Sequence, residues 1–144
     1  MALIMKTTPK ASDNKTTFGR SACPITNALD TFGDKWTLLI IRDLVLGKKR
    51  FQEFKFSPER IATNILADRL ERLQACDIVA RHAYQYNPVR YEYVLTKKGE
   101  TLRPILKDIV SWGLEHFPGA MVFAQSGNTK HWRWQNYDAS KNWF

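Results

Sequence analysis

Apolar residues recur at helical spacing through most of the chain between residues 24 and 117. They repeat every three or four positions, which places their side chains on one face of an α-helix. Four helices are predicted in this way, over residues 24–32, 36–46, 61–77 and 101–117. A shorter helix of one or two turns is predicted where Phe51 and Phe54 stand three positions apart, before Ser57 and Pro58 end it.

Residues that favour helix ends support these boundaries. Pro24 suits the first position of the first helix, and Gly33 and Gly47 end the first two helices. Thr96 can cap the last helix through its hydroxyl. Pro104 stands within that helix, so either the regular helix begins near Pro104 or the helix is kinked there.

Two short segments separate the third long helix from the last one. They are rich in Val, Ile and Tyr and cover residues 78–86 and 89–96. A turn at Asn87 and Pro88 joins them, so the pattern predicts a β-hairpin. In the second segment Tyr91, Tyr93 and Leu95 share one face, which we expect to pack against the core.

The two ends of the chain differ from this patterned middle. Residues 1–20 are rich in Thr, Ser, Lys and Pro and have no hydrophobic period after Met5, which predicts a mobile basic arm. Residues 118–144 are rich in aromatic and amide side chains, and the alternation in 131–137 permits a strand. The expected organisation is therefore an arm over 1–20, one domain over 21–117 and an extension over 118–144.

The order of these elements favours a winged helix-turn-helix domain with flanking dimerisation helices, a mainly α fold with a small β-hairpin (α+β). One helix of such a domain enters the major groove of DNA, so its outward face needs small or hydrogen-bonding side chains. The helix over 61–77 meets this requirement. Its core side carries Ala62, Leu66, Leu70 and Leu73, and its opposite side carries Thr63, Asn64, Ala67, Asp68, Glu71 and Arg72.

The side chains on this outward face can make specific contacts with DNA. Asn64 can bind adenine through two hydrogen bonds, Thr63 can reach a base or a phosphate, and Ala67 can contact a thymine methyl group. Asp68 would be repelled by phosphates unless it accepts from a cytosine amino group, and pairing with Arg72 is the alternative that we favour. For Thr63 and Asn64 the alternative is an ordinary solvated helix face.

Positive charge agrees with a nucleic-acid partner. The chain has 22 Lys and Arg residues against 14 Asp and Glu, a formal charge of +8. Arg90, beside the hairpin turn, is placed to enter a narrow groove or to meet a phosphate. Further cations precede the candidate recognition helix and could neutralise phosphates, unless they only form a solvated surface: Lys48, Lys49, Arg50, Lys55 and Arg60.

Other classes of protein are disfavoured. Cys23 and Cys76 stand far apart without a Cys and His cluster, so we expect no disulfide scaffold, no metal and no other cofactor. No run of about 18 apolar residues could cross a membrane, which favours a cytoplasmic protein without a membrane partner. His82, His116 and His131 have no catalytic partner at motif spacing, and a glycine-rich phosphate loop is missing, so we do not expect an enzyme.

Several ordered motifs resemble the HxlR-type family of bacterial winged helix-turn-helix transcription regulators, which are MarR-like. They are Cys-Pro at the first helix, GDKWT, a cation-Phe-x-Glu-Phe run, the leucine-spaced recognition helix and Arg-x-Glu-Tyr-x-Leu-Thr-x-x-Gly. The resemblance runs from about Cys23 to Phe117, roughly two thirds of the chain. It says little about the extension that follows.

The resemblance implies a homodimer that binds a double-stranded DNA operator with two half-sites and usually represses nearby genes. It makes 62–73 the core of the recognition helix, 84–93 the wing, and Lys35 a phosphate contact. Family dimers are built mainly from the first and last helices, which could instead only cover the monomer core. The residues concerned here are Ile25, Leu29, Leu102, Ile105, Leu106, Ile109 and Trp112.

Two positions depart from the family pattern. Members often have Gly where this chain has Arg60 and Asp77. Arg60 adds a cation beside the DNA. Asp77 adopts a positive φ at a helix end less readily than glycine would, although Asp tolerates that conformation better than most residues.

Cys23 is a candidate sensor. In some relatives the cysteine at this position responds to oxidants or to electrophiles such as quinones and aldehydes. A thiol at a helix N-terminus gains thiolate character from the helix dipole, and the thiolate is the reactive form. The alternative is that Cys23 is a small apolar cap.

Two further questions stay open. A winged helix used only for protein contacts is the alternative to DNA binding; it would have an acidic or apolar surface around Asn64, whereas the neighbouring residues are basic. The aromatic extension, with Trp132, Trp134, Tyr137 and Trp143, is expected to pack back on the core. It could also reinforce the dimer or line a pocket for a small-molecule effector.

Overall fold

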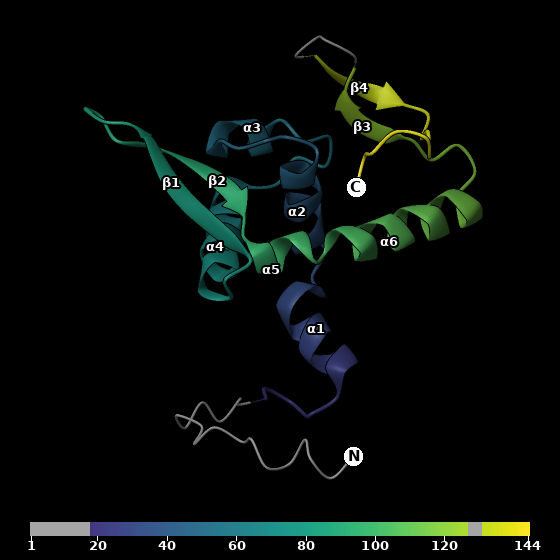
Figure 1. Ribbon diagram of the computed structural model, residues 1–144, viewed down its shortest axis with the longest axis horizontal. Helices are drawn as coiled ribbons and strands as arrows, with labels where there is room; N and C mark the ends of the chain where they lie inside the picture. The colour runs from purple at the N-terminus through teal and green to yellow at the C-terminus, as the bar shows by residue number, and fades with distance from the viewer. Residues whose placement is uncertain (1–17, 127–130) are drawn as a thin grey trace, which may run out of the picture. The chain divides into compact units, whose positions relative to one another are not determined.

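The protein, seen in a computed structural model, is described over residues 18–126 and 131–144. Most of the predicted basic arm lies outside this range. In chain order the elements are α1 (Pro24–Phe32), α2 (Thr37–Val45), α3 (Phe51–Lys55), α4 (Thr63–Ala75), β1 (Val79–Gln85), β2 (Arg90–Leu95), α5 (Lys97–Glu100), α6 (Arg103–His116), β3 (Val122–Gln125) and β4 (Trp132–Gln135) (Figure 1). The predicted mainly α fold with a small β-hairpin is confirmed. No helix in the described ranges has the length and apolar character needed to cross a membrane.

The chain divides after Thr31 into two compact units. Most of α1 belongs to the first unit, and this helix begins at Pro24 as predicted. It has no buried residue, and the side chains of Ile25 and Leu29 are exposed to 71% and 51%. Its apolar stripe is therefore accessible.

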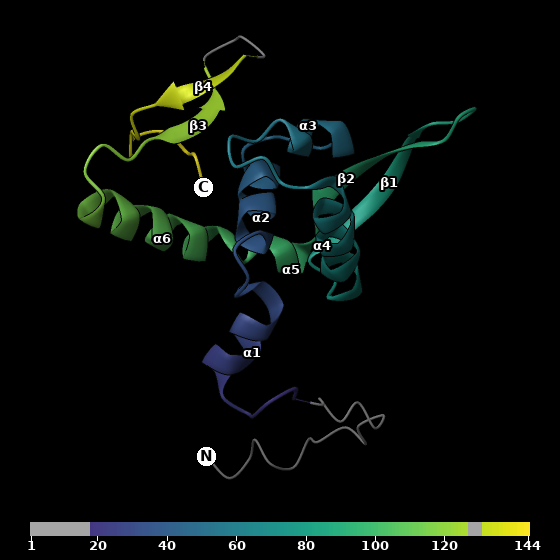
Figure 2. The ribbon, with the colours of Figure 1, turned by 180° about the vertical axis from the view of Figure 1, so that it is seen from behind.

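The core of the second unit, residues 32–144, forms where α2 packs against α4, α6 and β2 (Figure 2). From α4 it receives Leu66, Leu70 and Leu73, which are all nearly inaccessible to solvent. The predicted core side of that helix is confirmed for the leucines and wrong for Ala62, which is exposed and has an extended backbone before the first turn. The other buried apolar residues of this core are Ile40, Ile41, Leu44, Phe54, Ile61, Ile78, Val79, Leu102 and Leu106.

A buried polar network joins α2 to the segments on either side of α3. Asp43 and Lys48 are 4% and 2% exposed. The Lys48 ammonium donates hydrogen bonds to the Asp43 carboxylate at 3.1 Å and to the Ser57 hydroxyl at 2.8 Å, and the Ser57 hydroxyl donates to Asp43. Arg42 bridges Asp43 and Glu59, at 2.8 and 2.6 Å. Lys48 is thus a core residue rather than the surface cation that the sequence suggested.

β1 and β2 form an antiparallel hairpin that projects from the helices (Figure 1). Val79 pairs with Leu95 at its base. Tyr93 and Leu95 pack against the core as predicted, whereas Tyr91 is exposed. The predicted core face therefore includes only the inner half of β2, because the outer half extends beyond the helices.

A short helix, α5, precedes the last predicted helix, so Thr96 caps α5 and not the long helix that the sequence predicted. The Thr96 hydroxyl accepts from the Gly99 backbone N–H at 3.0 Å and so caps the short α5. Gly99 is required there because a Cβ atom would lie 2.2 Å from the Ile78 carbonyl oxygen. The long helix α6 then begins at Arg103, with Pro104 in its first turn, which is one of the two predicted alternatives.

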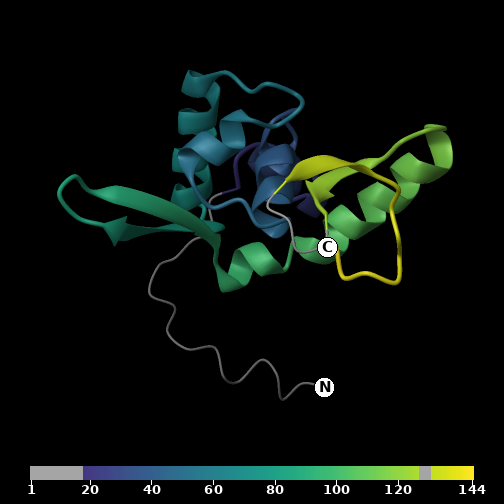
Figure 3. The same ribbon diagram turned by 90° about the horizontal axis from the view of Figure 1, so that it is seen from above.

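The C-terminal extension forms a second antiparallel hairpin, β3 and β4, on the opposite side of the helices from the first (Figure 3). Its β4 strand lies within 131–137, where the alternation permitted one. Val122 and Ala124 are buried, and Phe144 packs against the main core. The expectation that this extension packs back on the domain is confirmed.

Candidate nucleic-acid interface

The outward face of α4 is exposed along the helix. Because Leu66, Leu70 and Leu73 face the core, the helical period turns the intervening side chains away from it. The whole predicted set is exposed, as is Ala75 at the end of the helix: Thr63, Asn64, Ala67, Asp68, Glu71 and Arg72. The first turns of the helix thus present small and hydrogen-bonding groups, and the larger charged groups follow.

A chain of ion pairs connects α4 to the turn before α2. Arg69 donates to Asp34 through Nε at 2.9 Å, and the same guanidinium also pairs with Asp68. The favoured pairing of Asp68 with Arg72 is wrong, because the neighbouring Arg69 occupies that carboxylate. Arg72 remains exposed and has no ion-pair partner among the residues that the structure describes.

Asp34 also caps α2, which explains the Asp of the GDKWT motif. Its carboxylate accepts from the backbone N–H groups of Trp36 and Thr37 at 3.1 and 3.2 Å. Partial burial alone would raise the pKa of Asp34, but hydrogen bonds from Thr37, Arg69 and Trp36 outweigh it and lower the pKa to about 2. The carboxylate is therefore ionised at neutral pH and fixes α4 against the start of α2.

The β1–β2 hairpin, here called the wing, presents two exposed arginines, Arg81 and Arg90. Arg90 is exposed beside the turn, where Asn87 has a φ of 62° and the bond to Pro88 is cis. Arg81 lies with its guanidinium carbon 3.9 Å from the centre of the Tyr91 ring, so Tyr91 supports a cation instead of the core. Arg81 is not among the residues predicted to contact DNA, although its place in an alternating strand could have identified it.

Arg50 connects α3 to the wing. Its guanidinium lies 4.2 Å from the centre of the Tyr84 ring on β1 and 3.5 Å from the Glu92 carboxylate on β2. The backbone N–H of Tyr93 donates to the Lys49 carbonyl at 2.7 Å and continues the connection. About half of the Arg50 side chain, 51%, is still exposed. This residue, predicted to contact DNA, therefore also fixes the position of the wing.

Arg60 and Asp77 have left-handed backbones, with φ of 55° and 58°. These are the two positions where the family resemblance suggests glycine. A left-handed conformation costs a residue with a Cβ atom about 1 to 2 kcal/mol. Arg60 is exposed three residues before α4. The chain thus has a cation close to the start of that helix at the cost of an unfavourable backbone conformation.

Lys35, which the family resemblance makes a phosphate contact, is exposed beside the start of α2. Its ammonium lies 5.1 Å from the centre of the Trp36 ring. Lys35, Arg50, Arg60 and Arg90 thus come from different segments that border the helix-turn-helix. Within the described ranges, there is no group of three or more His, Cys, Asp or Glu side chains that could hold a metal ion.

Comparison of this chain with known proteins shows which family has this arrangement of helices and wing. The profile of the HxlR-like helix-turn-helix family matches residues 31–121. The HTH-type transcriptional regulator YodB of Bacillus subtilis is 35% identical over 112 residues, which are 77% of this chain and 94% of YodB. The uncharacterized HTH-type transcriptional regulator YybR of the same organism is 37% identical over 94 residues, which are 65% of this chain and 75% of YybR.

Solved structures show the same similarity. The structure of the redox regulator HypR in its reduced form has a TM-score of 0.62 and 35% sequence identity, and the match covers 67% of this chain and 95% of HypR. The reduced form of YodB has a TM-score of 0.57 and 32% identity, and the match covers 69% of this chain and 99% of YodB.

Replacing Arg60 with glycine should stabilise the protein. Arg60→Gly removes the Cβ atom that makes the left-handed backbone costly, and we expect the free energy of unfolding to rise by about 1 kcal/mol. Arg60→Ala removes the same charge but retains the Cβ atom, so its stability should stay within about 0.5 kcal/mol of the parent. Urea denaturation measures both variants, and equal stabilities of the two would contradict the backbone argument.

Proposed function

This chain belongs to the HxlR-like helix-turn-helix family of transcriptional regulators, and from this premise we propose that it is a homodimeric repressor that binds a double-stranded operator with two half-sites. One observation carries the proposal. The outward face of α4 combines small, hydrogen-bonding side chains with exposed arginines on the adjoining wing. A helix that reads the major groove and a wing that follows the backbone need this combination. Such a regulator acts in the cytoplasm, where the bacterial chromosome lies.

Base recognition is assigned to the first turns of α4. Asn64 can read adenine, Thr63 can reach a base or a phosphate, and Ala67 leaves room for a thymine methyl group. Asp68 can accept from a cytosine amino group through the carboxylate oxygen that Arg69 leaves free. All four side chains are exposed, so DNA binding requires none of them to leave the protein core.

Phosphate binding is assigned to the cations that surround α4. Arg90 and Arg60 are exposed, and Arg50 keeps part of its guanidinium accessible while it supports the wing. Lys35 and Arg72 complete this set. Contacts of this kind position the protein on the duplex and make its affinity depend on salt, but they do not select a sequence.

The dimer interface is assigned to the accessible apolar residues of α1 and α6. Ile105, Ile109 and Trp112 on α6 are 40%, 46% and 59% exposed. Leu102 and Leu106, which the sequence analysis assigned to the dimer, are instead core residues of the protomer and are left out of the interface. Ile25 and Leu29 of α1 are exposed as well, and a second copy would cover the apolar residues of each helix.

A redox or electrophile response is a second component of the proposal, with Cys23 as its sensor. Cys23 is exposed, as a reactive thiol must be. Hydrogen bonds from the backbone and side chain of Thr26 and from the backbone of Ile25 lower the pKa of the Cys23 thiol. The similar protein HypR is itself a redox regulator.

Alanine substitutions at Asn64 and Arg90 should weaken DNA binding in different ways. On an operator located by footprinting the DNA upstream of its own gene, Arg90→Ala should reduce the salt dependence of log K by up to about one unit for every sequence. Asn64→Ala should instead relax the preference at one base pair, at a cost of about 1 to 3 kcal/mol. Lys107→Ala, an exposed cation on α6, is the control. If both variants bound like the parent, a winged helix for protein contacts would replace this proposal.

A charge on the exposed face of α6 should dissociate the dimer. Ile109→Glu places a carboxylate in the proposed apolar interface, and we expect sedimentation equilibrium at micromolar concentration to give the mass of one chain. Lys107→Glu changes charge at an exposed position outside the apolar stripe and should remain dimeric. A parent protein that sediments as a monomer would refute the assignment.

Substitution of Cys23 should abolish the response to electrophiles. After treatment with a quinone, the parent should lose operator affinity, whereas Cys23→Ser should keep it, because serine is not a comparable nucleophile at neutral pH. Cys76→Ser, which removes the other exposed cysteine, should respond like the parent. Equal responses of Cys23→Ser and the parent would eliminate Cys23 as the sensor.

A further inference from the structure

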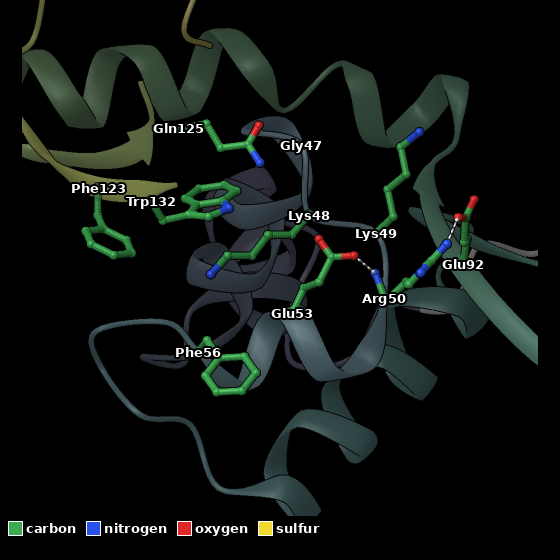
Figure 4. A pocket seen from close by; sticks show the side chains of 10 residues that line it. All are labelled: Gly47, Lys48, Lys49, Arg50, Glu53, Phe56, Glu92, Phe123, Gln125 and Trp132. Atoms are coloured by element: carbon green, nitrogen blue, oxygen red, sulfur yellow. Dashed lines mark hydrogen bonds and ion pairs between the residues drawn. The ribbon is translucent and has the colours of Figure 1, made fainter. Parts of the chain in front are cut away.

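We infer that a cavity between the α2–α3 loop and the C-terminal hairpin binds a small anionic aromatic molecule and that its occupation changes the position of the wing. The cavity has a volume of about 800 Å³, within the range of about 300 to 1,000 Å³ that is usual for sites of small ligands. It is lined by the residues drawn in Figure 4. The regulatory part of this inference rests on the proposed DNA-binding function.

One end of the cavity is aromatic. Figure 4 shows Phe123 and Trp132 of the C-terminal hairpin on the same side as Phe56, which follows α3. Phe56 is 79% exposed, a large apolar surface that the protein leaves uncovered. Flat faces of this kind favour a planar aromatic ring, because stacking adds to the removal of apolar surface from water.

The opposite end is cationic. Lys49 and Arg50 lie there beside Glu92 (Figure 4). Lys49 is exposed and has no ion-pair partner in the part of the chain that the structure describes. Arg50 also stacks on Tyr84, and its ion pair with Glu92 is long, at 3.5 Å. The Glu53 carboxylate also lines the cavity, where it accepts from the Arg50 backbone N–H at 3.3 Å, and the side chains of Lys49 and Arg50 together can pair with a ligand carboxylate.

Lys48 and Glu53 lie between the two ends (Figure 4). The Lys48 ammonium lies 4.8 Å from the centre of the Trp132 ring while it is bound to Asp43 and Ser57. Because its charge is already compensated, Lys48 holds the aromatic wall in place and does not select the ligand. The cavity therefore fits a molecule with a fused aromatic body at one end and a single carboxylate at the other.

Two of the three aromatic residues of the cavity, Phe123 and Trp132, lie beyond the region that the family profile matches. The HxlR-like profile ends at residue 121, and Phe123, Gln125 and Trp132 follow it. These three residues line the cavity from the second hairpin, whereas the loop before α3 and the wing lie within the matched region. The extension thus adds a wall to a part of the helix-turn-helix that the family shares.

The cavity is connected directly to the wing. Arg50 binds both strands of the wing, through Tyr84 on β1 and Glu92 on β2. A ligand carboxylate that binds Arg50 competes with Glu92 and so weakens one of these two contacts. Because the neighbouring Lys49 carbonyl accepts from Tyr93 on β2, movement of the loop is transmitted to the same strand. We therefore expect the ligand to lower operator affinity.

Ligand binding is tested on the full chain without DNA. Isothermal titration should show 2-naphthoate binding at least about tenfold more tightly than its neutral analogue 2-naphthamide, since only the acid can pair with Lys49 and Arg50. Cyclohexanecarboxylate, which lacks the aromatic face, should bind more weakly than naphthoate. Equal affinities for the acid and the amide would overturn the inference.

Matched variants locate the site. Trp132→Leu and Lys49→Gln should each weaken naphthoate binding about tenfold. Trp143→Leu, in the extension but outside the cavity, and Lys55→Gln, a nearby exposed cation outside it, should bind like the parent. Should Trp132→Leu fail to fold, Lys49→Gln, at an exposed position, decides the question. Parent affinity in Lys49→Gln would overturn the assignment.

The effect on the wing is tested with the operator. Saturating naphthoate should lower operator affinity at least about fivefold in the parent, and Trp132→Leu should need about tenfold more naphthoate for the same effect. If naphthoate binds and operator affinity stays unchanged, the regulatory part of the inference is overturned. If the protein binds no operator at all, the proposed function fails, while the titrations without DNA still decide whether the cavity takes the acid.

Discussion

The buried carboxylate of Asp43 determines how the helix-turn-helix is put together. It accepts hydrogen bonds from Arg42 on its own helix, from Lys48 in the loop before α3, and from Ser57 in the loop after α3. An ion pair with so little access to water is stable only when each charge has its partners, so these three segments cannot separate without leaving a charge unpaired. The short helix α3 has only five residues, and it is held on both sides by this network.

The position of the DNA-binding elements follows from that network and from one other ion pair. Arg42 continues from Asp43 to Glu59, next to the left-handed Arg60 that leads into α4. Asp34 then binds Arg69 in the middle of α4, at 2.9 Å. Helix α4 is thus held near its start and near its middle by ion pairs, while its outward face stays exposed.

The same loop serves the wing and the C-terminal hairpin. Within three consecutive residues, Lys48 contacts Trp132 of the extension, the Lys49 carbonyl accepts from β2, and Arg50 binds both strands of the wing. A run of three cations in a basic protein resembles a phosphate-binding patch, but these residues have different environments. This loop connects three parts of the structure, and this is why we place the regulatory cavity beside it.

The sequence by itself determined the elements that depend on local periodicity and on helix ends. The leucine spacing of α4, the Thr96 cap and the turn at Asn87 and Pro88 follow from neighbours within a few residues, where backbone geometry leaves few alternatives. The Asn64 face could be predicted for the same reason, since the side of a helix opposite its buried leucines must face outward.

Only the tertiary structure decided which charges are surface charges and which apolar residues are free. Lys48 is buried and Arg50 is not, although they stand two positions apart, because Asp43 and Ser57 approach from other segments. In α6, the stripe divides between the core and the surface because α2 covers only part of it. Partners that come from distant parts of a chain leave no periodic signal in it, so contacts of this kind cannot be read from a single sequence.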